Sequence, residues 1–200
     1  MMRESPIPIM NASLFARALP AALLAASLTL LSSGALAQAR PAPGAAAPAG
    51  APGGAQATLV ATFNDWGAYT AQTGRAKICY ALSQPKARQP ANLKDTPAYL
   101  FVSFRPGENV KNEVAAVLGF PTKDGGPAEA SVNQTTYALV TKGANAWIKN
   151  PAEEGQAVAT MSRGQSITVS ATSARGNKTT DRYSLAGFAQ ALDRARKECP

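Results

Sequence analysis

The chain of 200 residues contains no histidine and only two cysteines. Histidine is the commonest general base and a frequent metal ligand, so its absence removes the usual catalytic triads and most zinc and haem sites. The phosphate-binding glycine loops and the Gly-x-Ser-x-Gly turn of serine hydrolases are missing as well. These absences predict a protein that is not an enzyme, with no catalytic residue, no cofactor and no metal site.

The sequence also lacks an apolar run that is long enough to span a membrane. The apolar run of residues 18–31 has about 14 residues, whereas a bilayer needs roughly 20. It follows the basic Arg3 and Arg17 and precedes Ala35-Leu36-Ala37, a pattern that signal peptidase accepts. Residues 1–37 are therefore predicted to be a secretory signal peptide, starting at Met1 or Met10. Residue 38 is glutamine and not a lipid-bearing cysteine, so we expect a periplasmic or secreted protein with no transmembrane segment.

Acidic residues are scarce, with 12 against 20 basic residues. The signal peptide holds two of the basic residues and one of the acidic ones, which leaves 18 and 11 and a net charge of +7 for the mature chain. A basic protein favours anionic partners, and export makes nucleic acid the least suitable of these. The candidate anion-binding residues form two groups, which are Lys86, Arg88 and Lys94, and Arg175, Lys178 and Arg182. Convergence of the two groups would create a binding surface, and the simpler alternative is a solvated face.

Bulky residues are missing from residues 38–57, which consist mainly of alanine, proline and glycine. Such a segment cannot bury a core, and we predict a disordered tether. The folded domain is predicted to cover residues 58–200, a length that can bury a sizeable core.

Short apolar and β-branched segments separated by turn residues dominate this domain. They predict a mainly β fold, either a β-sandwich or a curled antiparallel sheet. The predicted strands are residues 63–70, 77–82, 98–104, 112–118, 129–132, 136–140, 146–149, 166–171 and 179–183.

Two short helices are predicted among the strands. The first begins after Asn150, a suitable N-cap followed by Pro151, and ends before Gly164. The second begins after Ser184 and carries one apolar face that ends at Cys199. We expect this C-terminal helix to pack on the sheet.

Cys79 and Cys199 are expected to form a disulfide, because two cysteines in an exported chain usually pair. In the chain-entropy description, closing a loop of this length stabilises the fold by about 4–5 kcal/mol. Two free thiols are the alternative, and a metal site with two cysteines and no histidine fits zinc poorly.

Carboxylates and aromatic residues are weaker indications of a functional site than the basic groups. Asp65 and Glu113 are the candidate pair for a hydrolase of envelope polymers that works through two carboxyl groups. Six aromatic residues could line a ligand surface, although core packing is the simpler interpretation. They are Trp66, Tyr69, Tyr80, Tyr99, Trp147 and Tyr183.

Several segments taken in order resemble the invasion-associated locus B family of exported proteobacterial proteins. These are Trp66-Gly-Ala-Tyr69, Lys77-Ile-Cys-Tyr-Ala-Leu82, Ala98-Tyr-Leu-Phe-Val-Ser103, Arg105-Pro106 with Asn112-Glu-Val114, Ala146-Trp-Ile148, and Tyr183-Ser-Leu-Ala-Gly-Phe188 before the terminal cysteine. The resemblance covers residues 62–199 and implies an exported, β-rich domain. It implies a link to host-cell invasion but no enzymatic activity, and it transfers no functional residue.

Together these features predict an exported binding or structural module of the periplasm or cell surface. Its expected partner is an envelope protein or an anionic component of the envelope or of a host surface. The alternatives are the carboxylate-dependent hydrolase and a factor that assists export or assembly of other envelope proteins.

Overall fold

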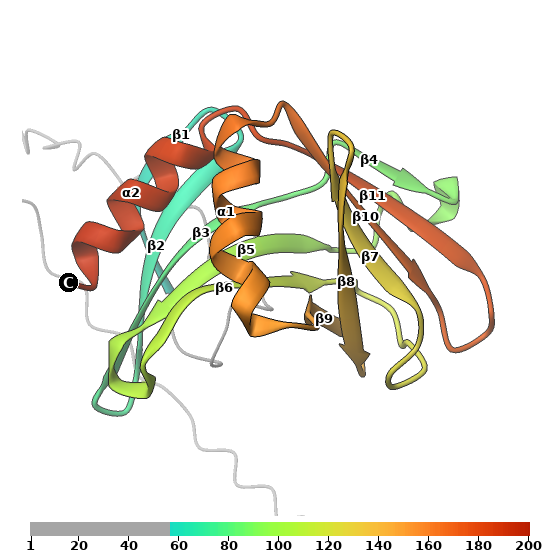
Figure 1. The fold of residues 1–200 in the computed structure, drawn as a ribbon, viewed down its shortest axis with the longest axis horizontal. Helices are drawn as coiled ribbons and strands as arrows, with labels where there is room; N and C mark the ends of the chain where they lie inside the picture. Colours follow the sequence, from blue (N-terminus) through green and yellow to red (C-terminus); the bar gives the residue numbers. More distant parts are fainter. Residues whose placement is uncertain (1–56) are drawn as a thin grey trace, which may run out of the picture. The chain divides into compact units, whose positions relative to one another are not determined.

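Residues 57–200, which the computed structural model describes, form a single antiparallel sheet of eleven strands (Figure 1). The predicted signal peptide and all of the predicted tether except Ala57 lie outside the described residues. The strands are β1 (Ala57–Phe63), β2 (Trp66–Thr73), β3 (Ala76–Ser83), β4 (Ala87–Gln89), β5 (Tyr99–Arg105), β6 (Val110–Val117), β7 (Ala128–Val132), β8 (Thr135–Lys142), β9 (Asn145–Ile148), β10 (Ser166–Thr172) and β11 (Lys178–Ser184). Their order across the sheet is β1-β2-β3-β5-β6-β9-β8-β7-β10-β11-β4.

Alternation of apolar and polar residues explains why these segments form strands with one buried face. In β10, Ile167, Val169 and Ala171 are buried while the residues between them are partly exposed. The turn from β7 to β8 uses Asn133, and the turn from β8 to β9 uses Gly143, both at positive φ. Tight hairpins need this left-handed conformation, which asparagine and glycine tolerate best.

The sheet curls, and the short strand β4 joins its far edge by pairing with β11. The turn before β2 also reaches the end of β11. Trp66 Nε1 donates a hydrogen bond to the Ser184 carbonyl oxygen at 2.8 Å, and the Asp65 N–H donates to the Ala186 carbonyl oxygen at 3.2 Å. Parts of the chain that are far apart in sequence therefore meet at one corner of the sheet.

Both α-helices lie on the same side of the sheet (Figure 1). They are α1 (Glu154–Arg163) and α2 (Phe188–Glu198), and the 3-10 turns are η1 (Ala91–Leu93), η2 (Pro106–Glu108) and η3 (Pro151–Glu153). Buried side chains of both helices join one large core cluster with the inner sheet face. Within it, the rings of Trp66 and Phe188 meet edge to face at 4.7 Å. Neither α-helix in residues 57–200 has the length and apolarity for a bilayer span.

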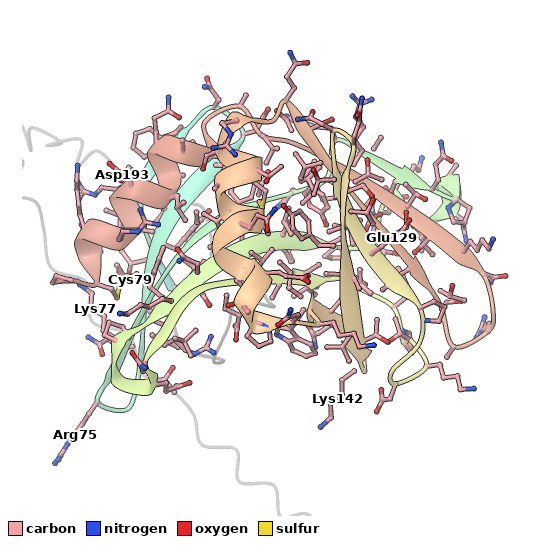
Figure 2. The ribbon with its side chains drawn as sticks, in the orientation of Figure 1. Arg75, Lys77, Cys79, Glu129, Lys142 and Asp193 are labelled. Atoms are coloured by element: carbon pink, nitrogen blue, oxygen red, sulfur yellow. A yellow bond between two sulfur atoms is a disulfide. The ribbon has the colours of Figure 1, made fainter. Side chains whose placement is uncertain are left out.

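The predicted disulfide joins Cys79 on β3 to Cys199 after α2, with Cα atoms 5.9 Å apart. Figure 2 shows Cys79 beside Lys77, near the C-terminal turn of α2. Lys77 adds an ion pair to Glu198, with an Nζ–Oε2 distance of 3.7 Å. The bridge therefore fastens the last turn of the chain to β3, the third strand from one edge of the sheet.

Several sequence predictions need correction. The predicted strand 63–70 is two strands, β1 and β2, because Asn64 at positive φ turns the chain between them. β1 begins at Ala57, inside the predicted tether, and β4 lies in a stretch expected to be loop. The C-terminal helix begins at Phe188 and not directly after Ser184, whose hydroxyl accepts a hydrogen bond from the Ala186 N–H. Of the two architectures considered, the curled sheet is present, since all described strands belong to one sheet.

Candidate functional site

Three loops at one end of the sheet enclose a cavity of about 350 Å³, which we call the loop pocket. Its volume lies at the lower end of the range for small-molecule sites. The loops are residues 90–97, residues 118–122 and the β10–β11 hairpin. The lining residues are Pro90, Asn92, Leu93, Phe120, Pro121, Ser173, Ala174, Arg175, Asn177 and Thr179. Proline, leucine and phenylalanine side chains thus form its apolar walls, and Arg175 brings a positive charge to it.

Backbone contacts hold these loops against one another. A Cβ atom at Gly119 would lie 2.1 Å from the Pro97 carbonyl oxygen, so the first two loops touch backbone to backbone and need a glycine there. The Ala174 N–H donates a hydrogen bond of 2.9 Å to the Pro121 carbonyl oxygen, and Thr122 and Ser173 form an isolated bridge. The pocket is therefore part of the folded framework.

Arg88 on β4 holds two of these loops through hydrogen bonds from its guanidinium group. Its Nε and Nη2 donate to the two oxygens of Asp181 on β11 at 2.7 and 2.9 Å. Nη1 donates to the carbonyl oxygens of Leu93 and Thr96, and Nη2 also donates to that of Leu118. A guanidinium group offers five N–H donors in a planar fork, and here the three nitrogens all have partners. Arg88 therefore ties β4 and β11 to two of the loops that line the pocket.

This arrangement separates Arg88 from its predicted role in anion binding. Its side chain is only 4% exposed and that of Asp181 only 1%, so the guanidinium group does not face solvent. Burial raises the pKa of the Asp181 carboxyl, and the paired Arg88 opposes that rise. The ion pair is a positioning element, and sequence spacing alone could not reveal it because 93 residues separate the two side chains.

The other predicted basic residues do not share one site. Arg175 lines the loop pocket, Lys94 lines a second cavity of about 400 Å³ together with Lys86 and Arg88, and Lys178 lines a third cavity of about 660 Å³. All three are exposed. The structure thus brings the three members of the first predicted group to one cavity and divides the second group, of which only Arg175 lines the loop pocket.

Lys86 and Arg182 form a separate pair of neighbours. The Lys86 N–H donates to the Arg182 carbonyl oxygen at 2.7 Å, and the Lys86 side chain forms an ion pair with Asp65. The Lys86 hydrogen bond, with help from Ser184, lowers the pKa of Asp65. Because Lys86 is already paired with a carboxylate, it adds less to an anion-binding surface than Arg175 does.

Asp65 and Glu113 do not form the carboxylate pair that a glycoside hydrolase requires. Glu113 lies three strands from Asp65 and is held by Arg105, with an Nη2–Oε2 distance of 2.8 Å. The strand spacing and the register place the two carboxyl groups roughly 20 Å apart. Hydrolytic pairs lie about 5–10 Å apart, so these residues do not share a site.

Glu154, at the start of α1, is a further carboxyl group with an altered pKa. Burial raises its pKa to about 7, the Glu113 carboxylate adds to the rise, and the Val114 backbone and Arg105 oppose it. Acidic residues and cysteines within residues 57–200 form no group of three that could hold a metal ion.

The six aromatic residues divide between the two faces of the sheet. Trp66 and Tyr183 belong to the core beneath the helices, as the simpler interpretation expected. Tyr80 and Tyr99 belong to a second apolar cluster on the opposite face, with Tyr69 and Trp147 packed against it.

Comparisons of the chain with known protein families, with curated proteins and with solved structures gave no match. The class of protein is therefore described by its own features. It is a disulfide-closed domain with one curled antiparallel sheet, two helices on one face, and an apolar pocket with a basic residue at one end.

Proposed function

We propose that this chain is an exported, non-enzymatic binding module of the periplasm or cell surface that takes an anionic component of the envelope or of a host surface. The loop pocket is the observation that carries the proposal. It combines apolar walls with the exposed Arg175, and the exposed Lys94 and Lys178 follow lining residues in the sequence and themselves line two other cavities. An amphiphilic or acidic ligand matches that combination, because apolar contact and charge attraction then act together.

Export is the second part of the proposal. The disulfide between Cys79 and Cys199 supports it, because such bridges persist in oxidising compartments and are rare in the cytosol. The N-terminal pattern of basic, apolar and small residues also supports it. Membership of the invasion-associated locus B family remains our proposal, on the segments that resemble it.

Sedimentation with lipid vesicles and binding to heparin test the charge requirement. We expect the mature protein to bind phosphatidylglycerol vesicles or heparin but not phosphatidylcholine vesicles, and to release them as salt rises. The double variant Arg175→Glu, Lys178→Glu should lose this binding.

The matched control is Arg75→Glu, Lys142→Glu, which changes the net charge by the same amount. Figure 2 shows both of these side chains projecting from hairpin tips, and neither residue lines the loop pocket. Equal loss of binding in the two double variants would mean that net charge acts and the pocket does not. Absence of binding to both anionic probes would overturn the anionic ligand.

Cross-linking of the mature protein in intact cells tests the partner class. A reproducible envelope-protein partner whose capture is lost in Arg175→Glu, Lys178→Glu would make the site a protein-interaction site. Capture that survives the substitutions would place the contact elsewhere on the domain and would favour the role in export or assembly.

A further inference from the structure

The end of the chain and the turn between β5 and β6 enclose a cavity of about 450 Å³, which we call the C-terminal pocket. This volume lies within the range of small-molecule sites. Figure 1 shows the C-terminus and the turn η2 on the same side of the sheet. The C-terminal pocket shares no lining residue with the loop pocket, so the two are separate candidate sites.

Apolar side chains from three parts of the fold line this pocket. Phe104 comes from the end of β5, Pro106 from η2 and Val110 from the start of β6. Cys199 lines the pocket from the chain end, where its disulfide to Cys79 ties it to β3. Because one wall is part of the sheet and another is held covalently, the pocket is preformed and offers apolar contact to a ligand.

Arg196, near the end of α2, brings an oriented positive charge to the same pocket. Its guanidinium carbon lies over the Phe104 ring, 5.3 Å from the ring centroid. Its Nη2 donates a hydrogen bond of 3.0 Å to Asn112 Oδ1. The stacking and the hydrogen bond hold the planar group in place while half of the side chain stays exposed.

The charge of Arg196 is less satisfied than the charges of the other basic residues on this part of α2. Arg194 pairs with Glu198 at 2.7 Å and Lys197 pairs with Asp193 at 3.6 Å. Arg196 reaches Asp193 only at 4.0 Å, which is beyond hydrogen-bond distance.

The lining of the C-terminal pocket also contains a second cation and no acidic side chain. The exposed Lys111 is this second cation, and no aspartate or glutamate is among the lining residues. The pocket therefore combines apolar walls with two positive charges, which favours an anionic ligand over a neutral or cationic one.

We propose that the C-terminal pocket is a second ligand site, which takes a small organic acid with one carboxylate on an apolar body. A carboxylate accepts two parallel hydrogen bonds from a planar guanidinium group, and Arg196 presents such a group at the pocket. Lys111 adds charge attraction, and the apolar body contacts Phe104 and Val110. This site does not depend on the loop pocket or on the proposed function.

Titration of the ¹⁵N-labelled mature protein with decanoate, followed by NMR, tests the site. We expect saturable shifts of the backbone amides of Asn109, Lys111 and Asn112 and of the Arg196 Nε–H group, all of which belong to lining residues. Decanol and decyltrimethylammonium have the same alkyl chain without the negative charge, and both should bind at least about tenfold more weakly.

Arg196→Met keeps an apolar side chain beside Phe104 and removes the charge. It should raise the Kd for decanoate about tenfold or more, because a hydrogen bond to a charged group is lost. Lys197→Met removes the same charge from the next position, which does not line the pocket, and should change the Kd less than about twofold. Arg175→Glu, Lys178→Glu should leave the shifts at Asn109 and Asn112 unchanged.

Three results would overturn the proposal. The first is the absence of saturable shifts with decanoate, and the second is equally tight binding of decanol. The third is an equal rise in Kd for Arg196→Met and Lys197→Met, which would mean that net charge acts and the pocket does not. Loss of anion binding at the loop pocket alone would contradict the proposed function and leave this site standing, so the two proposals fail separately.

Discussion

At the residue scale, the buried pair of Arg88 and Asp181 connects the fold to the candidate site. A buried ion pair contributes little when compared with apolar residues of similar size, but losing one partner leaves a buried charge. Here the arginine also satisfies carbonyl oxygens of Leu93, Thr96 and Leu118. Its loss should therefore affect both the stability and the shape of the loop pocket.

We expect Arg88→Met to lower the free energy of unfolding by about 3–5 kcal/mol, because Asp181 would remain buried without its partner. The double variant Arg88→Met, Asp181→Leu should regain part of that stability. Lys86→Met is the matched control, since its ion pair is exposed and worth about 1 kcal/mol or less. Urea denaturation measures all three, and equal effects of Arg88→Met and Lys86→Met would contradict the structural role.

Glu154 should make stability depend on pH. Its pKa is raised to about 7 in the folded protein, whereas the unfolded chain ionises near the ordinary value of about 4.3. Between these values the folded state keeps a proton that the unfolded state has lost, so stability falls as pH rises through this window. Glu154→Gln should match wild type near pH 4 and have the higher urea midpoint at pH 8. Its neighbour Glu153→Gln serves as control and should not reproduce that crossover with pH.

At the element scale, α2 depends on two features that lie outside its apolar face. The disulfide holds its last turn to β3. Gly187 precedes its first turn at φ 88°, where a Cβ atom would lie 1.8 Å from the Phe63 carbonyl oxygen. The chain therefore enters the helix through a position where only glycine fits.

Cys199→Ser should lower the free energy of unfolding by about 4–5 kcal/mol, the value expected for opening so long a loop. Wild-type protein unfolded in the presence of a reductant should show the same lowered urea midpoint. An unchanged midpoint in both experiments would mean that the bridge does not constrain the chain.

Gly187→Ala should destabilise the domain more than Gly176→Ala. Both glycines have positive φ, so both substitutions carry the backbone cost of about 1–2 kcal/mol. A Cβ at Gly176 meets nothing within 4 Å, but one at Gly187 collides with the backbone of Phe63. Thermal unfolding of the two variants measures the difference. Similar melting temperatures would show that the backbone at Phe63 moves away from the added Cβ at little cost in free energy.

At the scale of the whole molecule, one sheet carries two different surfaces. Its inner face and the two helices form the main core, and its far end supports the loop pocket. Its outer face carries a second, aromatic cluster that includes no residue of α1 or α2. The lining of the loop pocket shares no residue with that cluster, so substitutions in the pocket can be tested without altering it.

Export of the whole chain is open to direct measurement. When the 200-residue chain is expressed in a bacterium, we expect mass spectrometry of the periplasmic fraction to find a protein that begins at Gln38. Ala35→Asp with Ala37→Asp should block cleavage, because signal peptidase needs small residues there. A full-length product in the cytoplasm of cells that express the unaltered chain would contradict the prediction.

The sequence determined the features that depend on neighbouring residues. Short apolar and β-branched segments located strands such as β5 and β10, and the cap at Asn150 with the apolar face of α2 located the two helices. Two cysteines in a chain with a signal-like N-terminus were enough to anticipate the disulfide. Each of these signals is short-range, or depends on there being only one possible partner.

Only the tertiary structure decided which distant segments meet. The pairing of β4 with β11 buried Arg88 against Asp181, and so turned a predicted anion-binding residue into a support for the loop pocket. The sequence indicated only core packing for Tyr80, and the strand pairing placed it on a second apolar face away from the helices. The physical reason is that strand pairing and burial are set by contacts between residues far apart in the chain, and local periodicity carries no information about those partners.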